Sequence, residues 1–379
     1  MYIYEQKDWP NFYWKESRIA VLLHEVTILM GTVIGKMAAA GSIFQKEVLL
    51  QDLTDEIVKT SAIEGEHLNI DEVRSSVARK LDIQLSKKTA SSHYIDGIVE
   101  MMTDARCNHK ERLTLDRLCN WQASLFPSGN SGMHRITTGQ IRDDSQGPMQ
   151  VSSSVFGSDY VYFRAPPAEL LPSYISDFLH WTETTSDVNP LIKAAIAHLW
   201  IVTLHPFDDG NGRIARAVTE LMLSRADRSV YRCYSMSGQI HKDMSGYYKI
   251  LEQTQKGTMD VTPWLYWFLE TLQKALQGSS DLVDKTVAKA MTWHKLNQIV
   301  LDDDQKKIIT MLLDGFEGNL TSSKWAKICK CSQDTAIRSI NHLVKNKILV
   351  QQGAGRGTHY VLSVSWYEGH EKISKPPFS

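Results

Sequence analysis

The chain has 379 residues, of which 42% are apolar and 22% are charged. This is ordinary globular usage, and it excludes disordered, coiled-coil and collagen-like chains. Lys and Arg number 42 against 43 Asp and Glu, so the whole chain does not attract nucleic acid or anionic lipid electrostatically. At about 150 residues per domain, the length predicts two or three folded units.

The five cysteines are odd in number and form no CxxC pair, which favours reduced thiols and a cytoplasmic location. The first ten residues lack the basic end and apolar run of a signal peptide. The most apolar stretch, 19–44, is interrupted by His24, Glu25 and Lys36. It therefore predicts a buried helix or helix pair, and no membrane partner is expected.

Helical periodicity dominates the first third of the chain. The predicted helices there cover 18–37, 50–64, 70–81, 91–106 and 113–126. Gly65 is a C-terminal stop, and Asn69 with Glu72 forms a capping-box start for the next helix. These signals predict a separate short helix over Thr54–Glu64.

Glycine, serine and β-branched residues dominate 129–167. Within it, 151–156 and 160–163 flank Gly157-Ser158-Asp159, which predicts a β-hairpin. Helical patterns then resume over 167–184, 190–204, 212–226, 242–256, 262–276 and 281–300.

The last part of the chain starts after three aspartates, 302–304. One helix is predicted to end at residue 313, a second to begin at residue 321 and a third to cover 332–346. Two strands follow, over 348–352 and 359–362, with a glycine turn between them. Three helices followed by a strand pair predict a winged helix-turn-helix, with a domain boundary near residue 300.

The segment from His205 to Arg213 joins two apolar helices through a polar loop. Gly210 and Gly212 permit close approach of a ligand to the backbone, and the following helix offers unpaired amides and its positive dipole end. Arg213 and Arg216 add two planar sets of donors at i, i+3 spacing. The loop therefore predicts a site for a di- or triphosphate.

Two side chains in this loop suit transfer chemistry. Asp209 offers a hard oxygen ligand for Mg²⁺ beside the phosphates, and His205 can act as a general base near neutral pH. A lone histidine before a proline is usually structural, and a lone Gly-Asn-Gly is usually a turn. Their clustering with both arginines favours the functional interpretation.

The sequence HPFDDGNGR from His205 to Arg213, with Arg216, resembles the Fic family motif at every signature position. The resemblance implies a protein adenylyltransferase, in which the histidine deprotonates a target hydroxyl that attacks the α-phosphate of ATP and expels pyrophosphate. Phosphate-transferring relatives carry lysine where this chain has Gly212, so AMP transfer is expected.

The resemblance assigns roles residue by residue. It makes His205 the catalytic base, Asp209 the Mg²⁺ ligand, and Phe207 a buried anchor of the loop. The implied ATP-binding residues are Gly210, Asn211, Gly212, Arg213, Arg216, Tyr247, Tyr248 and Gln255. Either tyrosine can stack on the adenine, but tyrosines at helical spacing are as often core residues.

The predicted hairpin resembles the family's flap, whose strand edge aligns a target segment by main-chain pairing. The implied target-positioning residues are Phe156, Gly157, Ser158 and Asp159. An ordinary surface hairpin is the alternative.

Residues 60–65, TSAIEG, resemble the inhibitory motif of many Fic proteins. The resemblance implies that Glu64 pairs with Arg216 and excludes the γ-phosphate of ATP, so that the enzyme inhibits itself. A solvated glutamate at a helix end is the alternative.

The expected fold is mainly α, with a Fic-type helical core, a small β-hairpin flap, an N-terminal helical extension and a C-terminal winged helix-turn-helix. The expected domains are an N-terminal region 1–90 with the inhibitory helix 54–65, a catalytic core 91–278 with the flap 151–167, a linker helix 279–303, and the winged helix with its tail 304–379. The expected partners are ATP and a target protein with an acceptor hydroxyl, and a homodimer is a further expectation.

Two other functions compete with this interpretation. One is a metal-dependent phosphohydrolase with His198, His205, Asp208 and Asp209 as ligands. The other is a transcription regulator with a vestigial catalytic body, because 321–359 carries seven Lys and Arg against Asp334 and is a candidate DNA-binding segment.

Overall fold

α-Helices make up most of the protein in a computed structural model, which describes residues 1–39, 42–85, 88–145, 147–155, 158–296, 298–313, 316 and 318–363. The chain divides into two compact units, 1–280 and 281–379. The sheets among the described residues are three two-stranded antiparallel pairs. The mainly α fold expected from the sequence is confirmed.

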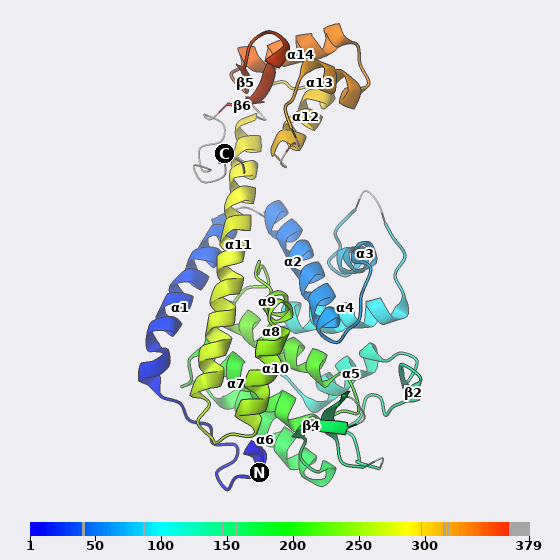
Figure 1. Ribbon diagram of the computed structural model, residues 1–379, viewed down its shortest axis with the longest axis vertical. Helices are drawn as coiled ribbons and strands as arrows, with labels where there is room; N and C mark the ends of the chain where they lie inside the picture. The colour runs from blue at the N-terminus through cyan, green and yellow to red at the C-terminus, as the bar shows by residue number, and fades with distance from the viewer. Residues whose placement is uncertain are drawn as a thin grey trace. The chain divides into compact units, whose positions relative to one another are not determined.

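The first unit contains most of the helices (Figure 1). Its elements are η1 (Ile3–Glu5), α1 (Glu16–Ala39), α2 (Ser42–Ile63), α3 (Ile70–Lys80), α4 (His93–Cys107), α5 (Leu115–Leu125), β1 (Asn130–Ser131), β2 (His134–Arg135), β3 (Gln150–Val155), β4 (Ser158–Arg164), η2 (Ala168–Leu170), α6 (Leu171–Thr184), α7 (Pro190–Leu204), α8 (Asn211–Asp227), α9 (Met236–Lys242), α10 (Met244–Gln255) and the first part of α11 (Thr262–Leu296).

α7 is the central helix of this unit. Between Leu191 and Leu204 every residue except Lys193 is buried, as expected of a helix that is apolar on all sides. Asn189 caps its start by accepting from the Leu191 amide at 2.9 Å. α7 packs along α8, so the loop that joins these two helices is held at both ends by the core.

α2 corrects one expectation from the sequence. The residues predicted as a separate helix over Thr54–Glu64 are the C-terminal half of one longer helix, α2. Its end agrees with prediction: Gly65 adopts a left-handed φ of +81°, and the Glu66 amide donates to the Ser61 carbonyl at 3.0 Å. The Asn69 carboxamide caps α3, also as predicted.

Two further helix boundaries differ from prediction. The helix expected over 242–256 is α10, and the short helix α9 that precedes it was not predicted. Asp243 separates the two helices, because its side chain caps α10 by accepting from the Gly246 amide at 3.0 Å. The two helices expected over 262–276 and 281–300 are the single helix α11. No glycine cap or proline interrupts it, since Gly278 keeps a helical conformation.

α1 buries one stripe of side chains, while Val21 and Ile28 on its other side are exposed. Residues 16–38 are long and apolar enough, by length and composition alone, to cross a membrane, which is also true of core helices in soluble proteins. The expectation that this chain has no membrane partner therefore stays a prediction.

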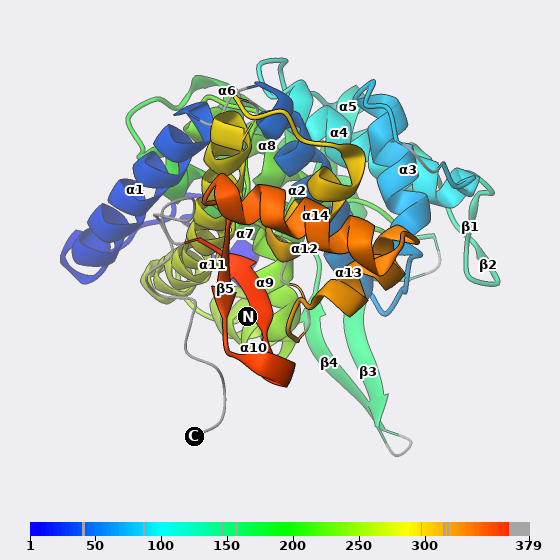
Figure 2. The ribbon, with the colours of Figure 1, turned by 90° about the horizontal axis from the view of Figure 1, so that it is seen from above.

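β3 and β4 form the predicted hairpin, which projects from the helices in Figure 2. Gln150 pairs with Arg164 at its base, and the register shifts between Val151 and Ser152. Of the predicted target-positioning residues, Phe156 and Gly157 lie outside the described residues. Ser158 and Asp159 form the first two positions of β4.

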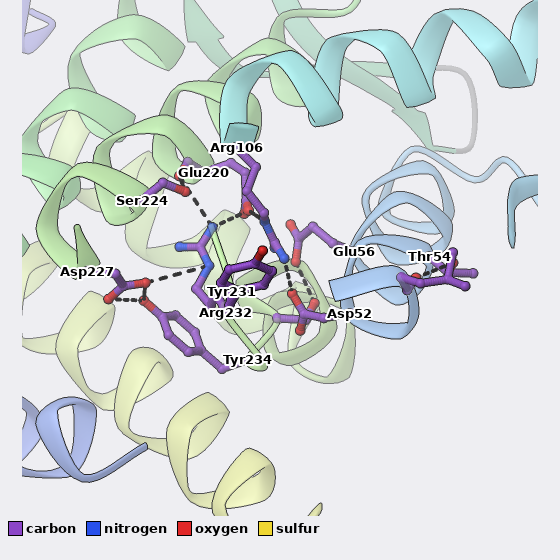
Figure 3. Close-up of polar contacts among 12 residues, drawn as sticks. Asp52, Thr54, Glu56, Arg106, Glu220, Ser224, Asp227, Tyr231, Arg232 and Tyr234 are labelled. Carbon is purple, nitrogen blue, oxygen red and sulfur yellow. Dashed lines mark hydrogen bonds and ion pairs between the residues drawn. The ribbon is translucent and has the colours of Figure 1, made fainter. Parts of the chain in front are cut away.

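A buried ionic cluster joins α2, α4 and α8 (Figure 3). Arg106 of α4 is bound by Asp52 of α2 through Nη1 at 2.5 Å, and by Glu220 of α8 through Nε. Arg232 pairs with the same Glu220. Nearby, Glu56 of α2 accepts from the amide and hydroxyl of Ser237. These contacts tie α2 to the core along one face.

The second unit contains the rest of α11 and a small domain. Its elements are α12 (Asp303–Leu313), α13 (Ser322–Cys329), α14 (Gln333–Lys345), β5 (Leu349–Gln352), η3 (Gly355–Gly357) and β6 (His359–Leu362). Trp325 is fully buried in its core, together with Leu296 and Leu301. The division at residue 280 therefore precedes the boundary expected near 300. The element order agrees with prediction, and its assignment as a winged helix stays a prediction.

Candidate active site

The loop between α7 and α8 is built by residues in unusual backbone conformations. His205 ends α7 with a left-handed φ of +49°, and Gly210 precedes α8 with a φ of +87°. A Cβ at Gly210 would lie 3.0 Å from atoms of Leu125 and Phe126, so the loop needs glycine there for both space and conformation.

Asn211 and Phe207 hold the loop closed. The Asn211 side chain accepts from the Phe207 amide at 3.0 Å and donates to the Phe207 carbonyl at 2.7 Å. The Phe207 side chain is fully buried, as an anchor residue should be. Asn211 also lines the cavity described below, so it both closes the loop and faces the predicted phosphate site.

A cavity of about 750 Å³ opens beside this loop. Nine of the predicted site residues line it: Glu64, His205, Asp209, Asn211, Gly212, Arg216, Tyr247, Tyr248 and Gln255. The hairpin closes another side of the cavity with residues 150–152 and 162–163. Residues from β3, β4, α8 and α10, together with the residue that follows α2, thus meet around one space.

The His205 imidazole is a neutral base. Burial lowers its pKa to about 4, and the charge of Arg142 acts in the same direction, while the Val202 carbonyl opposes both. Nδ1 lies 3.2 Å from the Val202 carbonyl, which assigns the proton to Nδ1. Nε2 is then the nitrogen with a free lone pair.

Arg216 is bound to the end of α2. Its Nη2 donates to the Glu64 carboxylate at 2.5 Å and to the Thr60 carbonyl at 3.0 Å, and its Nε donates to the Thr60 hydroxyl at 2.6 Å. A Cβ on Gly212 would lie 2.3 Å from the same Glu64 carboxylate, so the acid is pressed against the start of α8.

Arg213 is placed differently from the prediction. It does not line the cavity: its Nη1 donates to the Tyr94 hydroxyl at 2.7 Å and lies 3.3 Å from Glu66, and its guanidinium lies 5.1 Å from the Phe126 ring centre. The side chain is almost fully buried. Arg213 thus connects the α2–α3 loop to α4 and α8.

Asp209 fits a Mg²⁺ ion. Its carboxylate lines the cavity and accepts from the Ser131 hydroxyl and from the Gly210 amide at 2.5 Å, which leaves further oxygen lone pairs. Mg²⁺ is commonly held by one or two carboxylates together with substrate phosphates and water. Asp208 instead accepts from the Thr137 amide at 2.8 Å.

The metal-dependent phosphohydrolase is disfavoured by His198. Both of its ring nitrogens are engaged, with the Thr219 hydroxyl at 2.7 Å and the Tyr247 hydroxyl at 2.8 Å. His198 is buried, and burial lowers its pKa to about 3. It therefore supports Tyr247 and cannot join His205 as a metal ligand.

The tyrosines take one role each. Both line the cavity, but Tyr247 is buried against His198, whereas Tyr248 is 44% exposed. The sequence did not reveal the residues that hold the β3–β4 hairpin against α10. The Tyr160 hydroxyl donates to Glu252 of α10 at 2.8 Å, and Lys256 pairs with Glu252 at 2.6 Å. No local pattern signals these contacts.

Known families account for much of the chain. Residues 112–223 match the Fic/DOC family, and residues 2–83 match a domain of unknown function, DUF4172. A Fic family protein from Desulfovibrio desulfuricans G20 shares the fold, with a TM-score of 0.57 and 19% identity over 93% of this chain and 97% of that chain. The chain carries a Fic/DOC domain. The Fic/DOC match includes the loop between α7 and α8, and the DUF4172 match includes Glu64.

Curated relatives of the Fic/DOC domain carry enzyme names. The protein adenylyltransferase Fic of Nematostella vectensis is 25% identical over 248 residues, which are 63% of this chain and 51% of that relative. The protein adenylyltransferase Fic of Drosophila virilis is 32% identical over 130 residues, which are 32% of this chain and 25% of that relative. The chain spans about half or less of the length of these relatives.

Proposed function

We propose that this chain is a self-inhibited protein adenylyltransferase, which moves AMP from ATP to a serine, threonine or tyrosine hydroxyl of a target protein or of itself. One observation carries the proposal: a neutral histidine, His205, opens onto the same cavity as the buried arginine Arg216 and the Asp209 carboxylate. The names of the relatives support the same activity.

The reaction assigns one step to each group. Nε2 of His205 takes the proton of the target hydroxyl, whose oxygen forms a bond to the α-phosphorus of ATP. The bond from that phosphorus to the bridging oxygen breaks, and pyrophosphate leaves. Asp209 would hold a Mg²⁺ ion, which neutralises polyphosphate charge when bound. The amides at the start of α8 face the phosphates.

Self-inhibition follows from the Glu64 contact. Arg216 is the cavity's buried arginine, and Glu64 occupies one of its donors at 2.5 Å. A carboxylate in this position also repels a phosphate that approaches the same arginine. ATP can therefore bind, but its γ-phosphate is held away from Arg216 until Glu64 moves.

Labelled ATP tests the proposed activity. Purified chain is mixed with labelled ATP, Mg²⁺ and a lysate of the source organism, and modified proteins are identified by mass spectrometry. His205→Ala should lose roughly a hundredfold to ten-thousandfold of transfer while ATP binding stays measurable. The exposed His180→Ala is the matched control. Transfer by His205→Ala within tenfold of the parent would sink the assignment.

A DNA-binding role for residues 321–359 stays a second candidate. Lys327, Lys330, Arg338 and Lys345 are exposed there, and such side chains can contact a phosphate backbone. A salt-dependent shift of duplex DNA by the full chain, lost when these four are changed to Gln, tests it. A homodimer and a cytoplasmic location also stay proposals, the latter supported by five free thiols.

A further inference from the structure

Arg142 lies between β2 and β3, and only 3% of it is exposed. Its Nε donates to the His205 carbonyl at 2.8 Å, and its Nη2 donates to the Pro166 carbonyl at 2.5 Å. Nη1 pairs with Asp144. The Arg142 amide also donates to the Pro206 carbonyl at 3.0 Å. One buried arginine thus binds the two residues that begin the catalytic loop.

The backbone of His205 needs such support. Its φ of +49° lies in the left-handed region, which residues other than glycine rarely adopt. The ring forms a hydrogen bond with the Val202 carbonyl at 3.2 Å, which is long for a bond that orients an imidazole. The direction of the ring therefore depends on the backbone conformation that the Arg142 contact stabilises.

Arg142 also reaches the base of the hairpin. Pro166 follows β4 by two residues, and the carboxylate of Asp144 accepts from the Ala168 amide at 2.8 Å. The Ala165 amide donates to the Met149 carbonyl at 3.0 Å, which closes the hairpin base. The catalytic loop and the base of the strand pair are thus fixed to one guanidinium.

We propose that Arg142 is a positioning residue for the transfer reaction: it holds the His205 backbone in the left-handed conformation that directs the imidazole into the cavity, and it sets the hairpin relative to that imidazole. This role rests on the proposed adenylyl transfer, but the contact itself can be tested without it. Arg142 touches neither phosphates nor the reacting hydroxyl in this arrangement, since it does not line the cavity.

Arg142→Gln and Arg142→Lys test the role. Lysine keeps the charge but cannot span two carbonyls with a planar set of donors. We expect kcat to fall roughly tenfold to a hundredfold in Arg142→Gln, because a misplacement of about 1 Å can cost about a hundredfold. KM for ATP should stay within about threefold, and Arg142→Lys should recover part of the lost kcat.

Arg117→Gln is the matched control. Arg117 also donates to one carboxylate, that of Asp104, and to the carbonyls of Asp104, Asn108 and Glu111. None of these partners belongs to the catalytic loop. Its loss should lower stability without lowering kcat per folded molecule. Equal losses of kcat in Arg117→Gln and Arg142→Gln would reduce Arg142 to a general structural residue and overturn the proposal.

An NMR measurement separates this inference from the proposed function. The His205 Cε1–Hε1 resonance, assigned with His205→Ala, should shift in Arg142→Gln and stay in place in Arg117→Gln, whether or not any nucleotide is transferred. A folded Arg142→Gln with an unchanged His205 resonance and kcat within twofold of the parent overturns it. Should Arg142→Gln not fold, the same two readouts on Arg142→Lys decide.

Discussion

The burial of His205 sets the pH range over which it can accept a proton. Burial lowers its pKa to about 4, from an ordinary value near 6.5. Transfer needs the neutral ring, and the neutral form is lost only when the pH falls through the lowered pKa. We therefore expect the acid limb of kcat/KM near pH 4, and nearly constant activity between pH 5.5 and 7.5 as far as His205 is concerned.

The measurement is a pH–rate profile at constant ionic strength. Circular dichroism at each pH is the control, because unfolding in acid would also remove activity. A half-loss of kcat/KM near pH 6.5 with the fold intact would show that His205 is more open to water than its burial indicates.

Glu64 is expected to restrain the enzyme. Glu64→Gly removes the carboxylate that occupies Arg216, so transfer onto protein targets and onto the chain itself should rise at least tenfold at saturating ATP. Because Glu64 follows the last residue of α2, the substitution costs at most about 1 kcal/mol of helix propensity.

Asp55→Gly is the matched control for Glu64. It removes an exposed carboxylate from the same helix, α2, and should leave transfer unchanged. Arg216→Ala should be inactive with or without Glu64, since it deletes the phosphate contact that inhibition blocks. Equal rates for Glu64→Gly and the parent enzyme would make Glu64 an ordinary helix-end residue.

At the level of elements, α2 is held by buried charges as well as by apolar packing. Arg106 compensates both Asp52 and Glu220, and all three side chains are nearly or fully inaccessible to water. Burial alone would raise the pKa of Asp52, and the charge of Arg106 opposes that rise. Removal of Arg106 leaves the buried Asp52 carboxylate without its paired cation and leaves Glu220 with Arg232 alone.

Arg106→Met should therefore lower the free energy of unfolding by about 3–5 kcal/mol. Urea denaturation followed by circular dichroism measures this. The control is Arg79→Met, which breaks an exposed ion pair with Asp96 and should cost about 1 kcal/mol or less. Similar costs for the two variants would mean that water reaches the cluster around Arg106.

At the level of the whole molecule, the residues of the candidate site lie in one of the two compact units. Every cavity residue named above lies between 64 and 255, inside the first unit. The second unit has its own core around Trp325. We therefore expect that damage to the core of the second unit leaves nucleotide transfer intact.

Trp325→Ala should destabilise the second unit by about 3–5 kcal/mol, because it leaves a large cavity in a small core. Calorimetry should show that the unfolding transition of the second unit moves to lower temperature in the variant. Below the temperature of that transition, the parent and the variant should transfer AMP at the same rate. Phe178→Ala, in the core of the first unit, should move the other transition. Loss of transfer in Trp325→Ala at a temperature where the first unit is folded would contradict this division.

The sequence alone predicts the features that depend on neighbouring residues. The bounds of α7, the cap at Asn69 and the stop at Gly65 all follow from side chains a few positions apart. Backbone sterics and caps act over that range, so local patterns reveal them. The pairing of Glu64 with Arg216 was predicted through a family resemblance and not from any local signal.

Tertiary structure decided which of these side chains face one another. It turned Arg216 into the cavity and Arg213 toward Tyr94, although both stand on the first turns of α8. It also brought Arg142 to the His205 carbonyl, 63 positions along the chain. Such contacts join segments that only packing of the core brings together, so no sequence spacing encodes them. The residue types of the site are therefore local information, whereas the orientation of its side chains and the contact between Glu64 and Arg216 depend on the folded chain.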